Sequence, residues 1–348
     1  TQAPGLPQMT VHVQNPNLGF AGGHNRALEL SQTWNPDYVY LLNADAHVDP
    51  AFLARIVEVA SLHPRAAIVQ SRIMLEQSPA LLNSRGNALH FLGFGFSLGY
   101  RESFLSHPTS PGEVRDHFFQ SQGALVGGSR TPVVHAPARE PAVGLPLGRP
   151  GLEKTVSHLP VFYASGAGML IRASALNIIG GLFDSSYFMY HEDLDLSWRA
   201  RLAGYDILFA PDSIIFHHYE FTKSIRKFYW MERNRHLTNL ANYQWRTLFL
   251  LSPAYLVMEL GTLLFAARSH WVKQKIRAIA YLLKPSTWDW IRQRRKLIRR
   301  LRTVPDREIM THMVGVIVNQ EVENPLLTHI VNPTLNAYFR LLKYLVRW

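Results

Sequence analysis

The sequence predicts an α/β protein whose mostly parallel sheet is covered by helices and is followed by a helical, basic extension. Up to about residue 220, short apolar runs typical of buried strands alternate with helical patterns, an order that favours helices on both faces of a sheet. Beyond that point the pattern becomes helical and basic. We therefore expect one domain over residues 1–220 and a helical extension over residues 221–348.

A strand, turn and helix unit is predicted near the start of the chain. Residues 38–43 have the pattern of a buried strand, and Pro50 can open a helix that carries the apolar residues Phe52 and Ile56. Ligands of such sheets collect at the carboxyl ends of strands, where Asp45 is expected. Further strands are predicted at 66–70, 167–172, 206–210 and 213–217, with a weaker signal at 314–318.

Three carboxylates and an arginine surround another predicted helix start. The helix is indicated by apolar residues at i, i+4 and i+8, which are Leu194, Trp198 and Leu202. Gly204 can end this helix, so Glu192 and Asp193 fall at its N-terminal edge, where carboxylates are stabilised in their charged form. From the residues alone, the cluster is either a site of chemistry or an acidic helix start in which Arg199 forms an internal ion pair, with Asp195 as its expected partner.

Composition and charge narrow the classes of function. The chain has 348 residues, of which 47% are apolar, so it can bury a sizeable core. It has no cysteine, which excludes disulfides, thiolate metal sites and a cysteine nucleophile. The formal net charge is +11, and residues 223–302 alone carry 18 Lys and Arg against three acids. This localised excess predicts a polyanionic partner, and the interleaved apolar residues favour an anionic membrane surface.

Residues 247–267 form an apolar stretch about long enough to cross a bilayer, but Pro253 and Glu259 interrupt it. An in-plane or re-entrant amphipathic segment fits this pattern better than a clean span, and ordinary core helices with a solvated basic face remain the alternative. The basic run 292–302 also admits a nucleic-acid arm. Its apolar residues make it amphipathic, however, and no nucleic-acid motif accompanies it, so we expect no nucleic-acid partner.

Two segments are predicted to be loops. Residues 105–158 are rich in Pro, Gly, Ser and His and have no clear periodicity, which indicates a long loop or insertion. Residues 17–25, N-L-G-F-A-G-G-H-N, place three glycines in a polar turn ahead of a helix. Glycines let a backbone approach a bulky anion, and the N–H groups at a helix start can bind phosphate, although most such turns are only turns.

The order of these motifs is more specific than any one of them. The chain shows N-x-G-F-x-G-G-x-N at 17–25, a strand followed by N-A-D at 43–45, S-G-A-G-M-L-I-R at 165–172, F-M-Y-H-E-D-L-D-L-S-W-R at 188–199 and a strand ending in His217. This order resembles glycosyltransferase family 2 over roughly residues 11 to 220, and most of all its rhamnosyltransferase-like members. The run from Tyr229 to Arg233 and Asn234 is similar to the segment that follows the catalytic domain in those proteins.

The resemblance implies a GT-A fold, a nucleotide-sugar donor, Mg²⁺ or Mn²⁺ and an inverting displacement. Asp45 and His217 match the metal ligands, and Asn43 stands where the family's D-x-D motif has its first acid. Asp193 matches the catalytic base, and Glu192 is expected to touch the acceptor or to orient that base. The resemblance assigns donor or phosphate binding to Asn17, Gly19, Phe20, Gly22, Asn25, Asn43 and Arg199, and the acceptor or sugar pocket to Ser165, Gly166, Ala167 and Asp195.

The implied protein transfers a sugar, with rhamnose as the first candidate, to a hydroxyl of a glycan or lipid-linked acceptor in cell-envelope polysaccharide synthesis. It is expected at the cytoplasmic face of the membrane. The chain departs from the family at its front, where only residues 9–13 precede the glycine turn in place of a strand-helix-strand unit. We therefore expect a truncated transferase, and the alternative is a catalytically silent binding or scaffold protein on the same fold.

Overall fold

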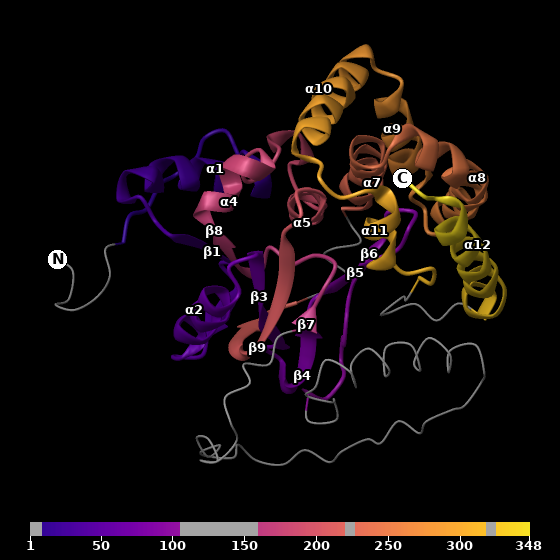
Figure 1. The fold of residues 1–348 in the computed structure, drawn as a ribbon. Helices are drawn as coiled ribbons and strands as arrows, with labels where there is room; N and C mark the ends of the chain where they lie inside the picture. The colour runs from indigo at the N-terminus through magenta and orange to yellow at the C-terminus, as the bar shows by residue number, and fades with distance from the viewer. Residues whose placement is uncertain (1–8, 105–158, 220–226, 318–324) are drawn as a thin grey trace.

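The computed structural model describes residues 9–104, 159–219, 227–317 and 325–348, so the predicted loop 105–158 lies outside the described residues. A sheet covered by helices lies beside a second group of helices (Figure 1). The strands are β1 (Tyr38–Leu42), β2 (Ala46–Val48), β3 (Ala66–Leu75), β4 (Ser78–Ser84), β5 (Asn87–Leu89), β6 (Gly95–Ser97), β7 (Leu159–Pro160), β8 (Gly168–Arg172) and β9 (Asp206–His217).

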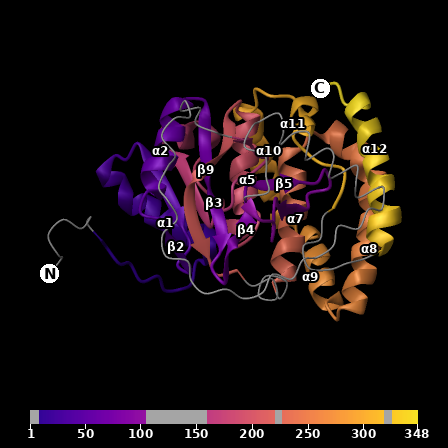
Figure 2. The same cartoon turned by 90° about the horizontal axis from the view of Figure 1, so that it is seen from below.

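The helices fall into two sets along the chain. The first set is α1 (Gly19–Ser31), α2 (Phe52–Leu62), α4 (Ala173–Ile179) and α5 (Glu192–Leu202), with 3₁₀ turns at Gln32–Trp34 and Ser185–Tyr187. The second set is α7 (Phe228–Asn242), α8 (Trp245–Arg268), α9 (Val272–Leu282), α10 (Pro285–Leu301), α11 (Asp306–Thr311) and α12 (Asn332–Leu345), the last preceded by a π-helical turn at Leu327–Val331. Helices α8 and α12 lie on the far side of the molecule from α1 and α2 (Figures 1 and 2).

The α/β class predicted from the sequence is confirmed. The sheet has the order β1-β8-β3-β9-β2, with β4 paired to β3 and β7 paired to β9. Strands β1, β3 and β9 all run in one direction, but β8 runs between β1 and β3 in the opposite direction. Among the described residues, the only parallel pair of neighbours is therefore β3 with β9, so the sheet is more mixed than expected. The common direction brings the carboxyl ends of β1 and β9 to one edge.

Strand β9 joins the two runs that the sequence predicts as separate strands. Ser71 of β3 pairs with Ala210 and the next residue, Arg72, pairs with Ile214, so residues 211–213 bulge out of the ladder. The bulge is held by a 2.7 Å hydrogen bond between the hydroxyls of Ser71 and Ser213. Pro211 has no N–H to donate to a ladder, and a bulge lets the strand continue past it.

Apolar side chains cover both faces of the sheet. Helix α2 packs Ile56 and Val59 against Val69 of β3 on one face. On the other face, α4 and α5 place Ile179 and Leu196 in a core with the sheet. A third core joins α5 to the second set of helices; its members include Trp198, Leu202, Tyr243, Ile298 and Phe339. Helix α5 is therefore packed between the sheet and the later helices.

The predicted strand 314–318 is not found in its described part. Val314 forms a single bridge with His90, and residue 318 lies outside the described residues. Val314 and Val316 are instead buried apolar side chains. The division of the chain at residue 220 stays a prediction.

Candidate functional site

The acidic helix start is confirmed, since α5 begins at Glu192 and ends at Leu202, two residues before Gly204, whose φ is +85°. The turn before it is sharp, with positive φ angles at Phe188, Tyr190 and His191. Few residues other than glycine adopt such angles without support from their surroundings.

Asn234 of α7 supplies that support. Its amide nitrogen Nδ2 donates to the backbone carbonyl oxygens of Tyr187, Met189 and Tyr190, at 2.9, 2.9 and 2.7 Å. Arg233 adds a donation to the Tyr187 oxygen at 3.1 Å. The sequence marked this pair only as a family-like run. The structure shows that Asn234 holds the turn that aims the carboxylates.

Asp193 is bound to two backbone groups. Its Oδ2 accepts the N–H of Gly166 at 3.0 Å, and its Oδ1 accepts the N–H of Leu194 at 2.7 Å. Burial raises the pKa of the Asp193 carboxyl above its ordinary value, although these N–H groups oppose the shift. The two hydrogen bonds fix the carboxylate in place, and the raised pKa makes it a stronger base than a surface aspartate.

Glu192, the residue before Asp193, is buried and lacks a hydrogen bond at one carboxyl oxygen. The residue is 5% exposed, and its Oε2 has no hydrogen-bond partner. Burial, and then the charge of Asp193, raise the pKa of Glu192 well above its ordinary value. Because Asp193 accepts two N–H groups while a Glu192 oxygen accepts none, we assign the charge to Asp193 and the proton to Glu192.

The second group of functional side chains lies where β1 and β9 end. Nε2 of His217 is 3.2 Å from Oδ1 of Asp45 and 3.1 Å from Nδ2 of Asn43. The Asp45 side chain is 58% exposed, so its carboxylate is open to a ligand. Ala46 pairs directly with His217 across β2 and β9, which fixes this approach. The three residues that the sequence placed near a metal are brought together.

The ring of His217 is oriented by Asn83, which the sequence analysis missed. Nδ1 of His217 lies 3.2 Å from Oδ1 of Asn83, an oxygen that can only accept, so Nδ1 carries the proton. Burial lowers the pKa of His217 below 6.5, although Asp45 opposes that shift. In the neutral ring Nε2 is therefore an acceptor, which lies 3.1 Å from the donor Nδ2 of Asn43 and 3.2 Å from the Asp45 carboxylate. The imidazole nitrogen and the carboxylate oxygen are both ligand types that divalent cations accept, and the Asn43 amide donates to this nitrogen here.

The turn of Ser165, Gly166 and Ala167 joins the two groups. Asn43 donates its backbone N–H to the Ala167 oxygen at 3.2 Å, while Gly166 donates to Asp193 on the other side. Buried Gln70 accepts the N–H of Ser165 at 2.7 Å and so holds the turn from beneath. One short loop thus fixes the metal-ligand candidates relative to the candidate base.

The glycine segment 17–25 meets the same loop, but the predicted turn is wrong: α1 begins at Gly19, so most of the segment is the first part of the helix. A Cβ added to Gly166 would lie 2.8 Å from the Phe20 ring, so the two segments are in close approach there. Gly19 has a φ of +70°, and a Cβ on it would lie 2.4 Å from the Phe188 oxygen. The Gly19 N–H donates to the Asn17 side chain at 2.8 Å and is therefore already satisfied. Gly22 is buried inside α1, and phosphate binding by this segment stays a prediction.

Three of the expected site residues have structural roles instead. The Arg199 side chain is 1% exposed. It donates hydrogen bonds to Oδ2 of Asp195 and to the carbonyl oxygens of residues 179, 181 and 182, so it does not face a nucleotide-sugar donor. Asp195 is fully buried and also bound by Arg294 of α10 at 2.8 Å, so it does not line an acceptor pocket. The Asn25 side-chain amide donates to the carbonyl oxygen of Phe183 and accepts the backbone N–H of the same residue. The internal ion pair of Asp195 with Arg199 is confirmed.

A second cluster of possible metal ligands lies in the later helices and was not seen in the sequence. Ligand atoms of Glu232, His236 and Glu259 lie within 4.8 Å of one another. The ammonium of Lys275 already donates to both carboxylates, and Arg235 pairs with both as well. Because these cations neutralise the acids, we interpret the cluster as an internal ion-pair network rather than a metal centre.

The comparisons with known proteins point to one class of enzyme. A stretch of 220 residues, 61% of this chain and 59% of the relative, is 26% identical to an N-acetylglucosaminyl-diphospho-decaprenol L-rhamnosyltransferase from two Mycobacterium tuberculosis strains. The chain is a relative of rhamnosyltransferases. A shorter stretch of 98 residues, 25% of this chain and 37% of the relative, is 35% identical to the rhamnosyltransferase WbbL of Escherichia coli K12.

Two further comparisons add little. No family model matches the chain. Among solved structures, GalNAc-T7 with UDP, GalNAc and Mn²⁺ superposes with a TM-score of 0.41 at 12% identity, over 65% of this chain and 35% of that one. That likeness is too weak to carry an argument. The chain spans 59% of the length of the Mycobacterium relative.

Proposed function

We propose that this chain is an inverting, metal-dependent glycosyltransferase that moves a sugar from a nucleotide-sugar donor to an acceptor hydroxyl. The observation that carries the proposal is the 165–167 turn, which is hydrogen-bonded to Asp193 on one side and to Asn43 on the other. A base and a set of cation ligands held by one loop match the needs of glycosyl transfer, in which one group takes a proton while another stabilises a leaving diphosphate.

Asp45 and His217 are the proposed metal ligands, with Asn43 beside them. The neighbouring carboxylate oxygen and imidazole nitrogen are the ligand types of a divalent cation such as Mg²⁺ or Mn²⁺, and the Asn43 amide would release Nε2 to bind it. Only one of the protein groups is an anion, which leaves room for the phosphate oxygens of a donor. When bound, the ion would offset the negative charge of the departing diphosphate.

Asp193 is the proposed general base. An acceptor hydroxyl loses its proton only as its oxygen attacks, so the base must be fixed and charged at that moment. The N–H groups of Gly166 and Leu194 fix the carboxylate. In the proposed step, the acceptor oxygen bonds to the anomeric carbon, the bond to the nucleoside diphosphate breaks, and the hydroxyl proton passes to Asp193. Glu192, as a neutral acid, can donate a hydrogen bond to a sugar hydroxyl.

The substrates and the location are proposed from the relatives. The Mycobacterium relative is named for rhamnosyl transfer to a diphospho-decaprenol-linked acceptor. We extend a rhamnosyl donor, a glycan or lipid-linked acceptor and a role in cell-envelope polysaccharide synthesis to this chain. A lipid-linked acceptor requires work at a membrane, and the basic helices after residue 227 fit the cytoplasmic face of an anionic membrane.

The test is turnover of nucleotide sugars by the full chain. The chain is incubated with dTDP-, UDP- and GDP-sugars and a lipid-linked acceptor, with Mn²⁺ or with chelator, and release of nucleoside diphosphate is followed. Acceptor-dependent release that chelator abolishes supports the proposal. A folded chain that binds nucleotide sugar but releases no nucleoside diphosphate would support the alternative, a catalytically silent binding protein. The presence of only one carboxylate among the proposed metal ligands also favours that alternative.

A further inference from the structure

Helix α8 presents a long apolar face to the outside of the molecule. Phe249, Leu256, Leu260 and Leu264 are 77%, 66%, 64% and 72% exposed, and they lie on one side of the helix. Between residues 249 and 267 this side carries no charged residue. Among the described residues, α8 is the one helix that is long and apolar enough to cross a membrane, and 17% of its apolar window is buried.

The opposite side of α8 is bound lengthwise to the protein. Leu251, Ala254 and Met258 pack into the core shared with α5 and α10. Glu259, the acid that interrupts the apolar stretch in the sequence, turns inward and pairs with Lys275 and Arg235. A helix attached to its own protein along one side cannot be surrounded by lipid, so it lies in the interface with its outer face immersed.

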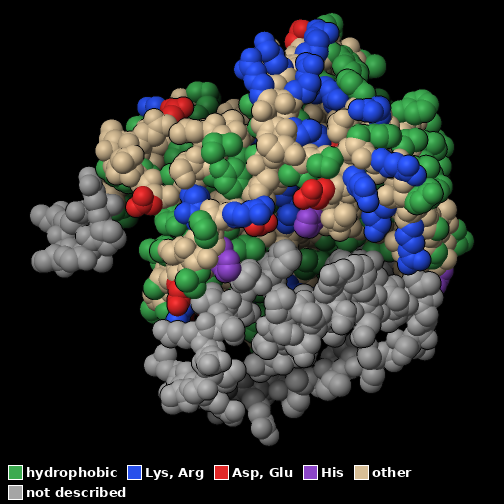
Figure 3. Space-filling view, viewed as in Figure 1, with side chains coloured by type: hydrophobic (Ala, Val, Ile, Leu, Met, Phe, Trp, Pro, Cys, Tyr) green, Lys and Arg blue, Asp and Glu red, His purple; other side chains and the backbone are tan. Residues whose placement is uncertain are grey.

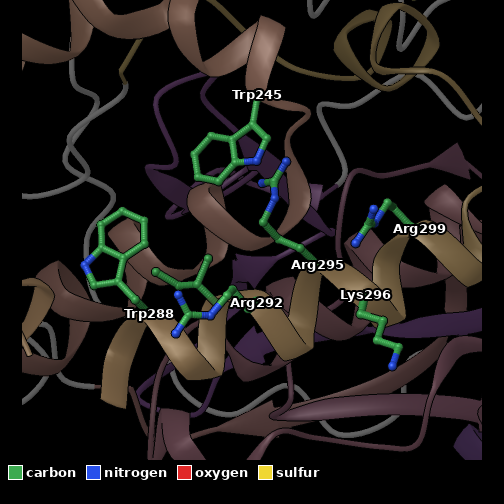
Figure 4. Close-up of a pocket in the computed structure, with 7 residues that line it drawn as sticks. Trp245, Trp288, Arg292, Arg295, Lys296 and Arg299 are labelled. Carbon is green, nitrogen blue, oxygen red and sulfur yellow. The ribbon is translucent and has the colours of Figure 1, made fainter. Parts of the chain in front are cut away.

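A pocket with mostly apolar walls and basic side chains around it opens at the N-terminal end of this apolar face. Its volume is ≈ 430 Å³, and its walls are Trp245, Trp288, Ile291, Arg292, Arg295, Lys296 and Arg299 (Figure 4). Trp245 is the first residue of α8, and the others come from α10. The guanidinium carbon of Arg295 lies 4.0 Å from the centre of the Trp245 ring, which fixes that ring at the pocket wall.

The protein neutralises only part of the positive charge around the pocket. Arg292 pairs with Asp289, and Arg295 donates to the backbone carbonyl oxygen of Tyr243 at 2.8 Å. Lys296 and Arg299 are exposed and form no ion pair with any described residue. Basic side chains with hydrophobic ones between them cover α10 and the neighbouring helices (Figure 3). Lys296 and Arg299, the two cations left unpaired by the described residues, lie along α10 beyond Arg295, on its far side from Trp288 (Figure 4).

We propose that the basic side chains around this pocket bind the phosphate group of an anionic phospholipid while the outer face of α8 is immersed in the same leaflet. The inference rests on the membrane attachment in the proposed function. Tryptophan is favoured at the level of lipid headgroups, and an adjoining apolar face needs an apolar partner, which a nucleic acid cannot supply. Lys296 and Arg299 would contact the phosphate, and the acyl chains would pack against Trp245 and then against Phe249.

The test compares two double variants of the full chain in vesicle flotation. Lys296→Gln with Arg299→Gln removes the free cations of the pocket. Lys284→Gln with Arg300→Gln is the matched control, because it removes the same charge from exposed positions in and beside α10 that do not line the pocket. Vesicles of phosphatidylcholine alone and with phosphatidylglycerol are used, and inorganic phosphate is added as competitor.

The wild-type chain should float with the phosphatidylglycerol vesicles. Diffuse attraction is worth about fivefold for each cation near the surface, so removing two cations costs up to roughly 30-fold on that ground, and the pocket variant should lose more than this. The control should lose clearly less. An equal loss in both variants would refute the pocket and leave diffuse attraction, and binding that millimolar phosphate abolishes would assign the pocket to a free anion. No flotation of the wild type would overturn the lipid inference. Nucleotide-sugar binding is measured separately, so the proposed transferase function would still be tested if the lipid inference failed.

Discussion

Asp193→Asn tests the assignment of the base, because it keeps the shape of the side chain but removes its basicity. Oδ1 and Oδ2 of Asp193 accept one N–H each, from Leu194 and Gly166. The amide of an asparagine has one acceptor oxygen, so its NH₂ would face one of these donors. We expect the free energy of unfolding to fall by about 1–3 kcal/mol for the unpaired buried group.

The loss of catalysis should be larger than this loss of stability. A positioned general base contributes about 10²- to 10⁴-fold, so kcat should fall by that factor while the Kd of the donor stays nearly unchanged. The assay is nucleoside diphosphate release at saturating donor, combined with calorimetric titration of the same donor. Asp37→Asn, at an exposed aspartate, is the matched control and should keep wild-type turnover. If Asp193→Asn keeps more than about a tenth of wild-type kcat, the reasoning is wrong.

The pH profile separates the roles of the two neighbouring acids. Burial raises the pKa of Asp193, so kcat/KM should fall, as the pH is lowered, at a pH above the ordinary aspartate pKa. If Glu192 is protonated, as its unpartnered oxygen indicates, Glu192→Gln removes no charge and should leave this pH unchanged. A shift of the acid limb to lower pH in Glu192→Gln would show that Glu192 carries a charge instead.

Three further predictions follow from the geometry. Asp45→Ala should weaken Mn²⁺-dependent donor binding by at least about tenfold in calorimetry, since even the partners of metal ligands affect affinity this much. Because burial lowers the pKa of His217 below 6.5, Mn²⁺ affinity should be constant from pH 8 to 6.5 and fall only in more acid solution; a loss already at pH 7 would contradict the neutral ring. Asp195→Asn should lower the free energy of unfolding by about 3–5 kcal/mol in denaturant titration, because it leaves Arg199 and Arg294 buried without a counter-charge. Burial raises the pKa of Asp195, but Arg294 and Arg199 lower it below its ordinary value, so this difference should be present at neutral pH and disappear as the pH falls through the lowered pKa.

Local patterns were sufficient for much of the fold. The start of α5 follows from its apolar repeat and acidic first turn, and strand β1 and helix α2 follow from their periodicity and from Pro50. The approach of Asn43 and Asp45 to His217 was also predictable, because residues at the ends of strands with a common direction meet at one edge of a sheet.

Contacts between distant segments were not predictable from one sequence. Arg199 was assigned to a donor because a guanidinium fits phosphate, but the carbonyl oxygens of residues 179–182 satisfy it in the interior. Asp195 receives a second arginine from α10, which no local pattern indicates. Asn83 lies 134 residues from the histidine that it orients, and no sequence signal marked it. Asn234 did carry a signal, since it ends the family-like run after β9, but its role in holding the turn before α5 required the structure.

Asp45 and His217 are proposed to hold a divalent ion that binds a nucleotide-sugar donor. The most direct test of this proposal is calorimetric titration of the full chain with dTDP-, UDP- and GDP-sugars, in Mn²⁺ and again in chelator, with the Asp45→Ala variant in parallel. One nucleotide class should bind the wild type in Mn²⁺, and this binding should be lost or strongly weakened in chelator and in the variant. Donor binding of equal affinity with and without metal would contradict the proposal, as would a folded wild type that binds none of the donors.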